Sequence, residues 1–72
     1  MNIITTKDTS RPGNDCWIYE SVSLVEQFNV YAIIVCQSII GWSPQKNIFV
    51  AQTTTDLSIA AKMFNDYTQG YD

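Results

Sequence analysis

The side chains that most often carry chemistry are scarce in this chain of 72 residues. It has no histidine, which removes the usual general base and metal ligand at neutral pH. Its two cysteines, Cys16 and Cys36, have no neighbouring base to activate a thiol nucleophile, and two thiols cannot supply the four ligands of a structural zinc site. Three isolated glycines, Gly13, Gly41 and Gly70, each suit a turn or a helix end rather than a phosphate-binding loop. The sequence therefore predicts a protein that is not an enzyme and that uses no cofactor or metal.

Glu20 is the one acidic residue inside a predicted strand that is otherwise rich in apolar side chains. One interpretation is a carboxylate with a perturbed pKa at a binding site. The other is a charge on an edge strand that discourages aggregation. We favour the second interpretation.

The charges favour a protein partner over nucleic acid. Seven acidic and four basic residues give a net charge of −3, and the basic residues are scattered singly along the chain. Phosphate contacts need clustered Lys and Arg, so direct nucleic-acid binding is not expected. Trp17, Tyr19 and Tyr31 have rings suited to stacking on single-stranded bases, but the basic rim of such a surface is missing. A weakly acidic surface suits a protein partner, especially a basic one.

We expect the protein to stay in the cytoplasm, with reduced thiols and no membrane segment. Residues 1–15 lack the basic start, apolar stretch and cleavage site of a secretion signal. The longest apolar run, residues 30–42, spans about 13 positions against the roughly 20 that a transmembrane helix needs. Gln37 and Ser38 also interrupt it.

Alternation of apolar and polar residues predicts an antiparallel meander over residues 16–53. Residues 16–25 have period two, with one face formed by Cys16, Ile18, Val22 and Leu24. Residues 28–40 form the next strand, apolar at even and odd positions, and residues 47–53 form the third. A three-residue loop centred on Glu26 would set Val30 opposite Val22 and Cys36 opposite Cys16. That pairing permits a cross-strand disulfide, although reduced thiols are favoured. Residues 1–15 are expected to be irregular or to add a short edge strand.

One amphipathic helix is predicted over residues 55–69. Thr54 or Thr55 would cap its first free N–H groups, and Asp56 would favour its positive end. An apolar stripe follows at helical spacing, made by Leu57, Ala60, Ala61, Phe64 and Tyr67. The opposite side holds Ser58, Lys62, Asp66 and Gln69. Gly70 is suited to end the helix, with Tyr71 folding back onto it. The predicted fold class is α+β: an antiparallel meander of three or four strands, then one C-terminal helix packed on one face, in a single domain of residues 1–72.

The helix is expected on the even-numbered face of the first hairpin, because Ala60 and Ala61 let its backbone approach the sheet closely. The other face would then be uncovered. Its predicted interface residues are Trp17, Tyr19, Tyr31, Ile33 and Val35, with Trp42 at the edge in the following turn. Apolar patches of this kind usually mark interaction surfaces, and aromatic residues are common energetic centres of interfaces. We therefore predict a binding module that acts on a protein partner and forms a homodimer. The alternative is an oligomer that holds a small molecule in an aromatic pocket between subunits.

The ending FVAQTTTDLSIAAKMFNDYTQ resembles a strand, cap and helix pattern found in small bacterial proteins, and residues 31–68 carry that likeness. As a class, a very small, acidic, histidine-free domain with two apolar sheet faces resembles phage-encoded inhibitors of bacterial defence systems, including anti-CRISPR proteins. The resemblance implies an inhibitor that binds a bacterial host protein in the host cytoplasm, without turnover. A bacterial regulatory or accessory protein that acts by the same kind of binding is the other alternative.

Overall fold

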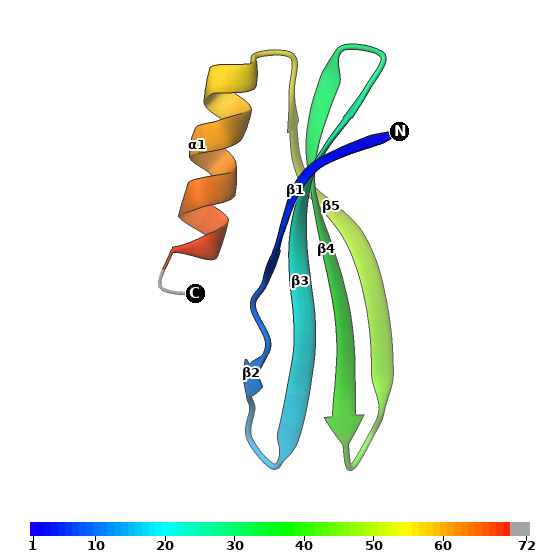
Figure 1. Cartoon of the computed structure of the whole chain (residues 1–72). Coiled ribbons are helices and arrows are strands. Elements are labelled where there is room, and N and C mark those ends of the chain that lie inside the picture. Colours follow the sequence, from blue (N-terminus) through cyan, green and yellow to red (C-terminus); the bar gives the residue numbers. More distant parts are fainter. Residues whose placement is uncertain (70–72) are drawn as a thin grey trace.

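The computed structural model describes residues 1–69 and has an α+β fold, as the sequence predicts. Its elements are β1 (Asn2–Asp8), β2 (Arg11–Pro12), β3 (Cys16–Gln27), β4 (Val30–Gly41), β5 (Gln45–Thr54) and α1 (Leu57–Thr68). The strands form one antiparallel sheet in the order β1-β3-β4-β5, with β2 also paired to β3. The single helix packs against one face of this sheet (Figure 1). Most of residues 1–15 therefore belongs to the sheet edge, as β1 and β2.

The β3–β4 hairpin closes through the two residues Phe28 and Asn29, with Gln27 opposite Val30. Both turn residues have positive φ angles, 52° and 63°, which is the geometry of a type I′ turn and matches the twist of the strands. The predicted three-residue loop around Glu26 is therefore wrong. Val22 lies opposite Val35 instead of opposite Val30. The turn escapes sequence analysis because it lacks the usual glycine and places a bulky residue in the left-handed region.

This register reverses the expected faces of β4. Side chains alternate between faces along a strand, so pairing shifted by an odd number of residues exchanges them. The even-numbered side of β3 thus shares a face with the odd-numbered side of β4, and α1 covers that shared side, which we call the helix face. Tyr31, Ile33 and Val35 lie on the helix face, where Ile33 is fully buried and Val35 is 4% exposed. Their predicted place on an uncovered surface is therefore wrong.

The register also separates the two thiols. Cys16 lies opposite Gly41, whereas Cys36 lies opposite Ser21. By the same alternation, their side chains are on different faces of the sheet. Both cysteines are free, and the cross-strand disulfide that the expected pairing permitted is excluded.

Helix α1 begins one residue after its N-cap, Asp56. The Asp56 carboxylate accepts hydrogen bonds from the backbone N–H groups of Ser58 (2.8 Å) and Ile59 (3.2 Å). The Thr54 hydroxyl instead accepts from the backbone N–H of Asp56, at 3.2 Å. The cap is thus Asp56 rather than Thr54 or Thr55, because a carboxylate at this position satisfies two free donors at once. The helix is correspondingly shorter than the predicted 55–69.

The buried side of α1 is a narrow stripe of Ala60, Phe64 and Thr68, with Met63 beside it. Three members of the predicted stripe are exposed instead: Leu57, Ala61 and Tyr67. The predicted polar side, by contrast, is exposed as expected (Ser58, Lys62, Asp66 and Gln69). A helix lying alone on an open sheet has neighbours on one side only, so its flanking apolar positions stay in solvent. The expected cap at Gly70 and the contact of Tyr71 lie outside the described residues.

The core lies at one end of the molecule. Its six buried residues are Val22, Leu24, Ile33, Val35, Ala60 and Phe64. Helix α1 runs alongside the half of the sheet that holds the β3–β4 hairpin, and the other half, with β2, extends beyond the end of the helix (Figure 1). No helix within residues 1–69 is long and apolar enough to cross a membrane. The helix thus leaves two surfaces uncovered: the far half of its own face and the whole opposite face.

Candidate protein-binding surface

The face of the sheet opposite α1, here called the open face, is built by the odd-numbered side of β3 and the even-numbered side of β4. Residues directly opposite in an antiparallel pair point to the same side, so the register gives rows across this face. From the far end toward the hairpin, the rows are Trp17–Ile40, Tyr19–Ser38–Lys46, Ser21–Cys36–Ile48 and Ser23–Ile34–Val50. Strand β1 adds Asp8 beside Ser21, Thr6 beside Ser23 and Ile3 beside Val25. The open face therefore has apolar side chains at both ends and hydroxyl groups between them.

Large apolar side chains on this face are exposed to solvent. The exposed fraction is 54% for Ile40, 77% for Ile48, 56% for Val50 and 67% for Ile3. Within residues 1–69, no helix or strand packs over them. They come from three different strands, β1, β4 and β5, and share one face of the sheet.

Trp17 and Tyr19 form an aromatic pair on the open face. Their ring centroids are 6.0 Å apart and the ring planes meet at 68°, an edge-to-face arrangement that aromatic rings favour. Both rings remain substantially exposed. The contact restricts the orientation of both rings.

Two hollows lie on the open face. The first is lined by Tyr19, Ser21, Cys36 and Ile48, with Asp8 and Lys46 at opposite edges of the sheet. The second lies at the hairpin end and is lined mainly by apolar residues, among them Val25, Ala32, Ile34, Val50 and Phe28. The first hollow thus has charged residues of opposite sign at its two edges, and the second is largely apolar.

Of the six predicted interface residues, the structure brings only Trp17 and Tyr19 together on an uncovered face. Trp42 is 98% exposed in the β4–β5 turn. It borders a hollow with Cys16 and Ile39, which lie on the helix face, so it is apart from the aromatic pair. Tyr31, Ile33 and Val35 belong to the core side. Sequence reasoning missed Ile40, Ile48, Val50 and Ile3. The available signal, the apolar run Ile48-Phe49-Val50 in the last strand, concerned two of them.

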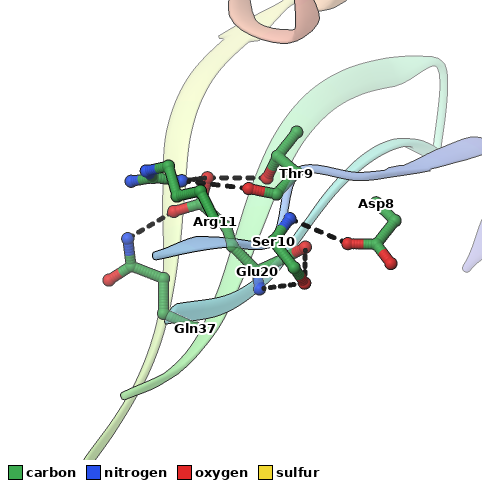
Figure 2. Close-up of polar contacts among 6 residues, drawn as sticks. All are labelled: Asp8, Thr9, Ser10, Arg11, Glu20 and Gln37. Carbon is green, nitrogen blue, oxygen red and sulfur yellow. Dashed lines mark hydrogen bonds and ion pairs between the residues drawn. The ribbon is translucent and has the colours of Figure 1, made fainter. Parts of the chain in front are cut away.

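A polar cluster around Glu20 occupies the helix face beyond the end of α1. Figure 2 shows Thr9, Arg11 and Gln37 converging on its carboxylate. The Thr9 hydroxyl and Arg11 Nη1 donate to Glu20 Oε1 at 2.6 and 2.7 Å. The side-chain amide of Gln37 donates to Oε2. These bonds fasten the chain reversal between β1 and β2 to the two central strands.

Backbone contacts hold the same cluster together. The backbone N–H of Thr9 donates to the Glu20 carbonyl at 2.9 Å, and the Glu20 N–H donates to the Ser10 hydroxyl at 3.1 Å. Ser10 is held in turn by its own N–H, which donates to Asp8 at 2.8 Å (Figure 2). Thr9 is completely buried by these contacts.

The carboxylate of Glu20 is ionised and fully engaged. Its side chain is 10% exposed. Burial by itself raises the pKa of a carboxyl group, but hydrogen bonds from Arg11, Gln37 and Thr9, together with the Arg11 charge, outweigh burial and lower the pKa of Glu20. Strand β3 lies inside the sheet, between β1 and β4, so the favoured interpretation of Glu20 as an edge-strand charge is wrong. The arrangement makes Glu20 a structural anchor.

No metal-binding group of three or more His, Cys, Asp or Glu side chains lies within the part of the chain that the structure describes. Each cysteine stands alone, on a different face. The exposed residues of the open face are therefore the strongest candidate for function.

Comparisons with known proteins give no assignment, because no family model, no curated protein and no solved structure matches the chain. Function is inferred below from the chain's own side chains.

Proposed function

We propose that the chain is a non-enzymatic protein-binding module that docks on a protein partner through the open face of its sheet. The observation that carries this proposal is the uncovered apolar surface on four strands, with Trp17 and Tyr19 at one end. Monomeric proteins rarely leave many large apolar side chains together on one face in water unless that face binds something. Trp and Tyr are enriched among the residues that dominate binding energy.

The partner that we propose is a bacterial host protein, which the chain blocks by occupying its surface. The support is the resemblance in size, acidity and composition to phage-encoded inhibitors of bacterial defence. The net charge of −3 favours association with a basic surface. A bacterial accessory protein that binds its partner in the same way is compatible with the same surface, and the partner's identity separates the two cases.

The small-molecule alternative loses its main support. The aromatic pocket between subunits required Tyr31 beside Trp17 and Tyr19, but Tyr31 packs on the helix face. The open face keeps a single aromatic pair, and its two hollows lie toward its middle and its hairpin end. An open sheet face with one aromatic pair at its end is better suited to binding a protein surface than to enclosing a small molecule.

The proposal is tested by affinity capture from bacterial lysate, followed by titration of the purified partner. The test variant is Trp17→Ser with Tyr19→Ser. The matched control is Leu57→Ser with Ile59→Ser on the outer side of α1, where the two side chains have comparable exposure, 51% and 52%. We expect the test variant to weaken binding by roughly 30-fold or more, as loss of an interface anchor does, and the control to bind like the wild type.

Circular dichroism of both double variants checks that each remains folded. Equal binding by the two variants would show that the open face is not the docking surface. Failure of the wild-type chain to retain any protein in a stable ratio would contradict the proposed function itself.

A further inference from the structure

The two edges of the sheet differ in how well they are protected against pairing with another chain. The β1–β2 edge is interrupted by a bulge between Ile3 and Thr5, by the break at Thr9 and by Pro12. It also carries Lys7 and Asp8. Bulges, prolines and charges are the usual devices that prevent edge-to-edge association. Strand β5 forms the other edge, with no proline and with Lys46 as its one charge. Its pairing with β4 shifts once, between Val50 and Gln52, so the uninterrupted edge is the segment from Gln45 to Val50.

Strand β5 exposes apolar side chains on both of its faces. All residues from 45 to 50 are exposed, including Ile48 and Val50 on the open face and Phe49 on the helix face, which is 47% exposed. A partner seated only on the open face would leave Phe49 in water. A strand added beside β5 would cover all three side chains at once.

Between Gln45 and Val50, before the register shift, the outward backbone groups of β5 belong to its even-numbered residues. A two-residue hairpin is closed by a pair that exchanges both hydrogen bonds, here Gln27 and Val30. Bonded pairs alternate along antiparallel strands, so the even-numbered residues of β4 bond to β3 and the odd-numbered ones bond to β5. Phe49, opposite Val35, therefore bonds to β4. The N–H and C=O groups of Lys46, Ile48 and Val50 point away from the sheet.

We propose that β5 pairs antiparallel with β5 of a second copy of this chain, across a two-fold axis at Phe49. In this register Phe49 faces Phe49 of the partner subunit, and Ile48 faces the position of Val50. In the dimer, residues with outward backbone groups must lie opposite one another. All of them are even-numbered, so the numbers of two facing residues add to an even number, and the two-fold axis passes through a residue rather than between two. An axis at Ile48 would put Lys46 beside Val50, and an axis at Val50 would centre the pairing next to the register shift between Val50 and Gln52. The axis at Phe49 matches apolar with apolar and keeps the two copies of Lys46 far apart.

The predicted dimer is a continuous sheet with both open faces on the same side, because the two-fold axis is perpendicular to the sheet. Each α1 lies over the hairpin half of its own sheet (Figure 1), and antiparallel pairing places those halves at opposite ends. The helices therefore do not compete for space. This inference does not rest on the proposed function, since it concerns the strand edge and a copy of the chain itself.

The first test is the oligomeric state of the full chain, measured by light scattering over a concentration series. We expect a mass twice the 8.2 kDa of one chain. Ile48→Pro, which deletes an outward N–H, and Ile48→Lys should both return the mass to that of one chain. Ile3→Lys is the matched control, because Ile3 is an equally large exposed residue of the open face on the opposite edge, and it should leave the dimer intact.

The second test reads the register. Phe49→Cys places a thiol on the two-fold axis and should give a covalent dimer under mild oxidation. Val50→Cys faces Ile48 of the partner subunit and lies opposite Ile34 rather than a native cysteine, so it should not. The wild-type chain, with its native cysteines, shows the background. A wild-type monomer at all concentrations, equal dissociation by Ile3→Lys and Ile48→Lys, or a dimer broken only by Trp17→Ser with Tyr19→Ser would overturn the β5 pairing. Cross-linking through Val50→Cys alone would overturn the axis at Phe49.

Discussion

Replacing Glu20 with glutamine tests whether one polar cluster secures the half of the sheet that α1 does not reach. Glu20→Gln keeps the shape of the side chain and removes its charge. The oxygen atoms of Glu20 accept bonds from Thr9, Arg11 and Gln37. An amide has one oxygen, which can keep the bonds from Thr9 and Arg11, while its NH₂ group donates to Gln37 if the Gln37 amide turns over. The variant then loses the ion pair with Arg11 and the negative charge that strengthens all three bonds.

The expected loss follows from these contacts. Hydrogen bonds to charged groups contribute about 1.5–3 kcal/mol each. Arg11 is itself 35% exposed, so water recovers part of what the lost ion pair contributed. We expect the free energy of unfolding to fall by about 2–3 kcal/mol. For a domain of this size that corresponds to a decrease in Tm of roughly 10–20 °C.

The same contacts set a pH dependence with a definite sign. The folded protein lowers the pKa of Glu20 below its ordinary value of 4.5. A carboxyl group with a lowered pKa contributes stability above its unfolded pKa and loses that contribution as the pH falls through the folded pKa. The stability difference between wild type and Glu20→Gln should therefore be full at neutral pH and should shrink in acid, below about pH 4.5.

Urea and thermal unfolding followed by circular dichroism measure both effects. Glu26→Gln is the control on the same strand, because Glu26 accepts only the exposed bonds from Asn2 (3.2 Å) and the Asn29 N–H (3.1 Å). It should cost less than about 1 kcal/mol. If Glu20→Gln and Glu26→Gln unfold alike, or if the Glu20→Gln difference persists unchanged in acid, the cluster does not anchor the sheet.

Three further predictions concern single positions. Phe28→Asn should raise stability by about 1 kcal/mol in urea unfolding, because φ is 52° at this exposed residue and asparagine tolerates the left-handed region; a loss would mean that the Phe28 ring contributes more than its backbone costs. Phe64→Ala should cost about 3–5 kcal/mol by the same measurement, since Phe64 is 8% exposed in the core, and a cost below about 1 kcal/mol would contradict its central role. Gly41→Ala should lower Tm more than Gly13→Ala. A Cβ at Gly41 would lie 2.7 Å from the Cys16 Cβ, which is fixed to the backbone, whereas a Cβ at Gly13 would lie 2.5 Å from the Cys16 Sγ, which can move. A larger loss of Tm for Gly13→Ala would contradict this reasoning.

The sequence was sufficient to predict the fold class because periodicity is a property of each segment alone. Alternation identified β3, and helical spacing identified α1, in both cases without knowledge of any neighbour. The pairing between segments depends on the turn, and Phe28-Asn29 carries only half of a type I′ signal: asparagine at the second position is usual, whereas phenylalanine at the first is not. A loop misjudged by one residue then inverted every side chain of β4.

The candidate site was predictable where it depended on one strand alone, and unpredictable where it depended on the pairing of two strands. Trp17 and Tyr19 lie on the face that alternation within β3 assigns to them, so their placement did not depend on the register. Tyr31, Ile33 and Val35 depended on it entirely, since β4 is apolar on both sides and offers no internal clue to which side is buried. Glu20 was singled out correctly, but its partners Thr9 and Arg11 come from a segment without a clear pattern.

The half of the sheet beyond α1 is a single layer with solvent on both sides. Its strands are held by backbone pairing and by the Glu20 cluster, with none of the six core residues beneath them. Such a region opens at a lower free energy than the whole domain, and its amide hydrogens exchange faster than those under the helix. Trp17 and Tyr19 lie in this region, opposite Ile40 and Ser38. If the proposed partner binds these two residues, it should suppress this local opening and slow amide exchange in the strands of this half.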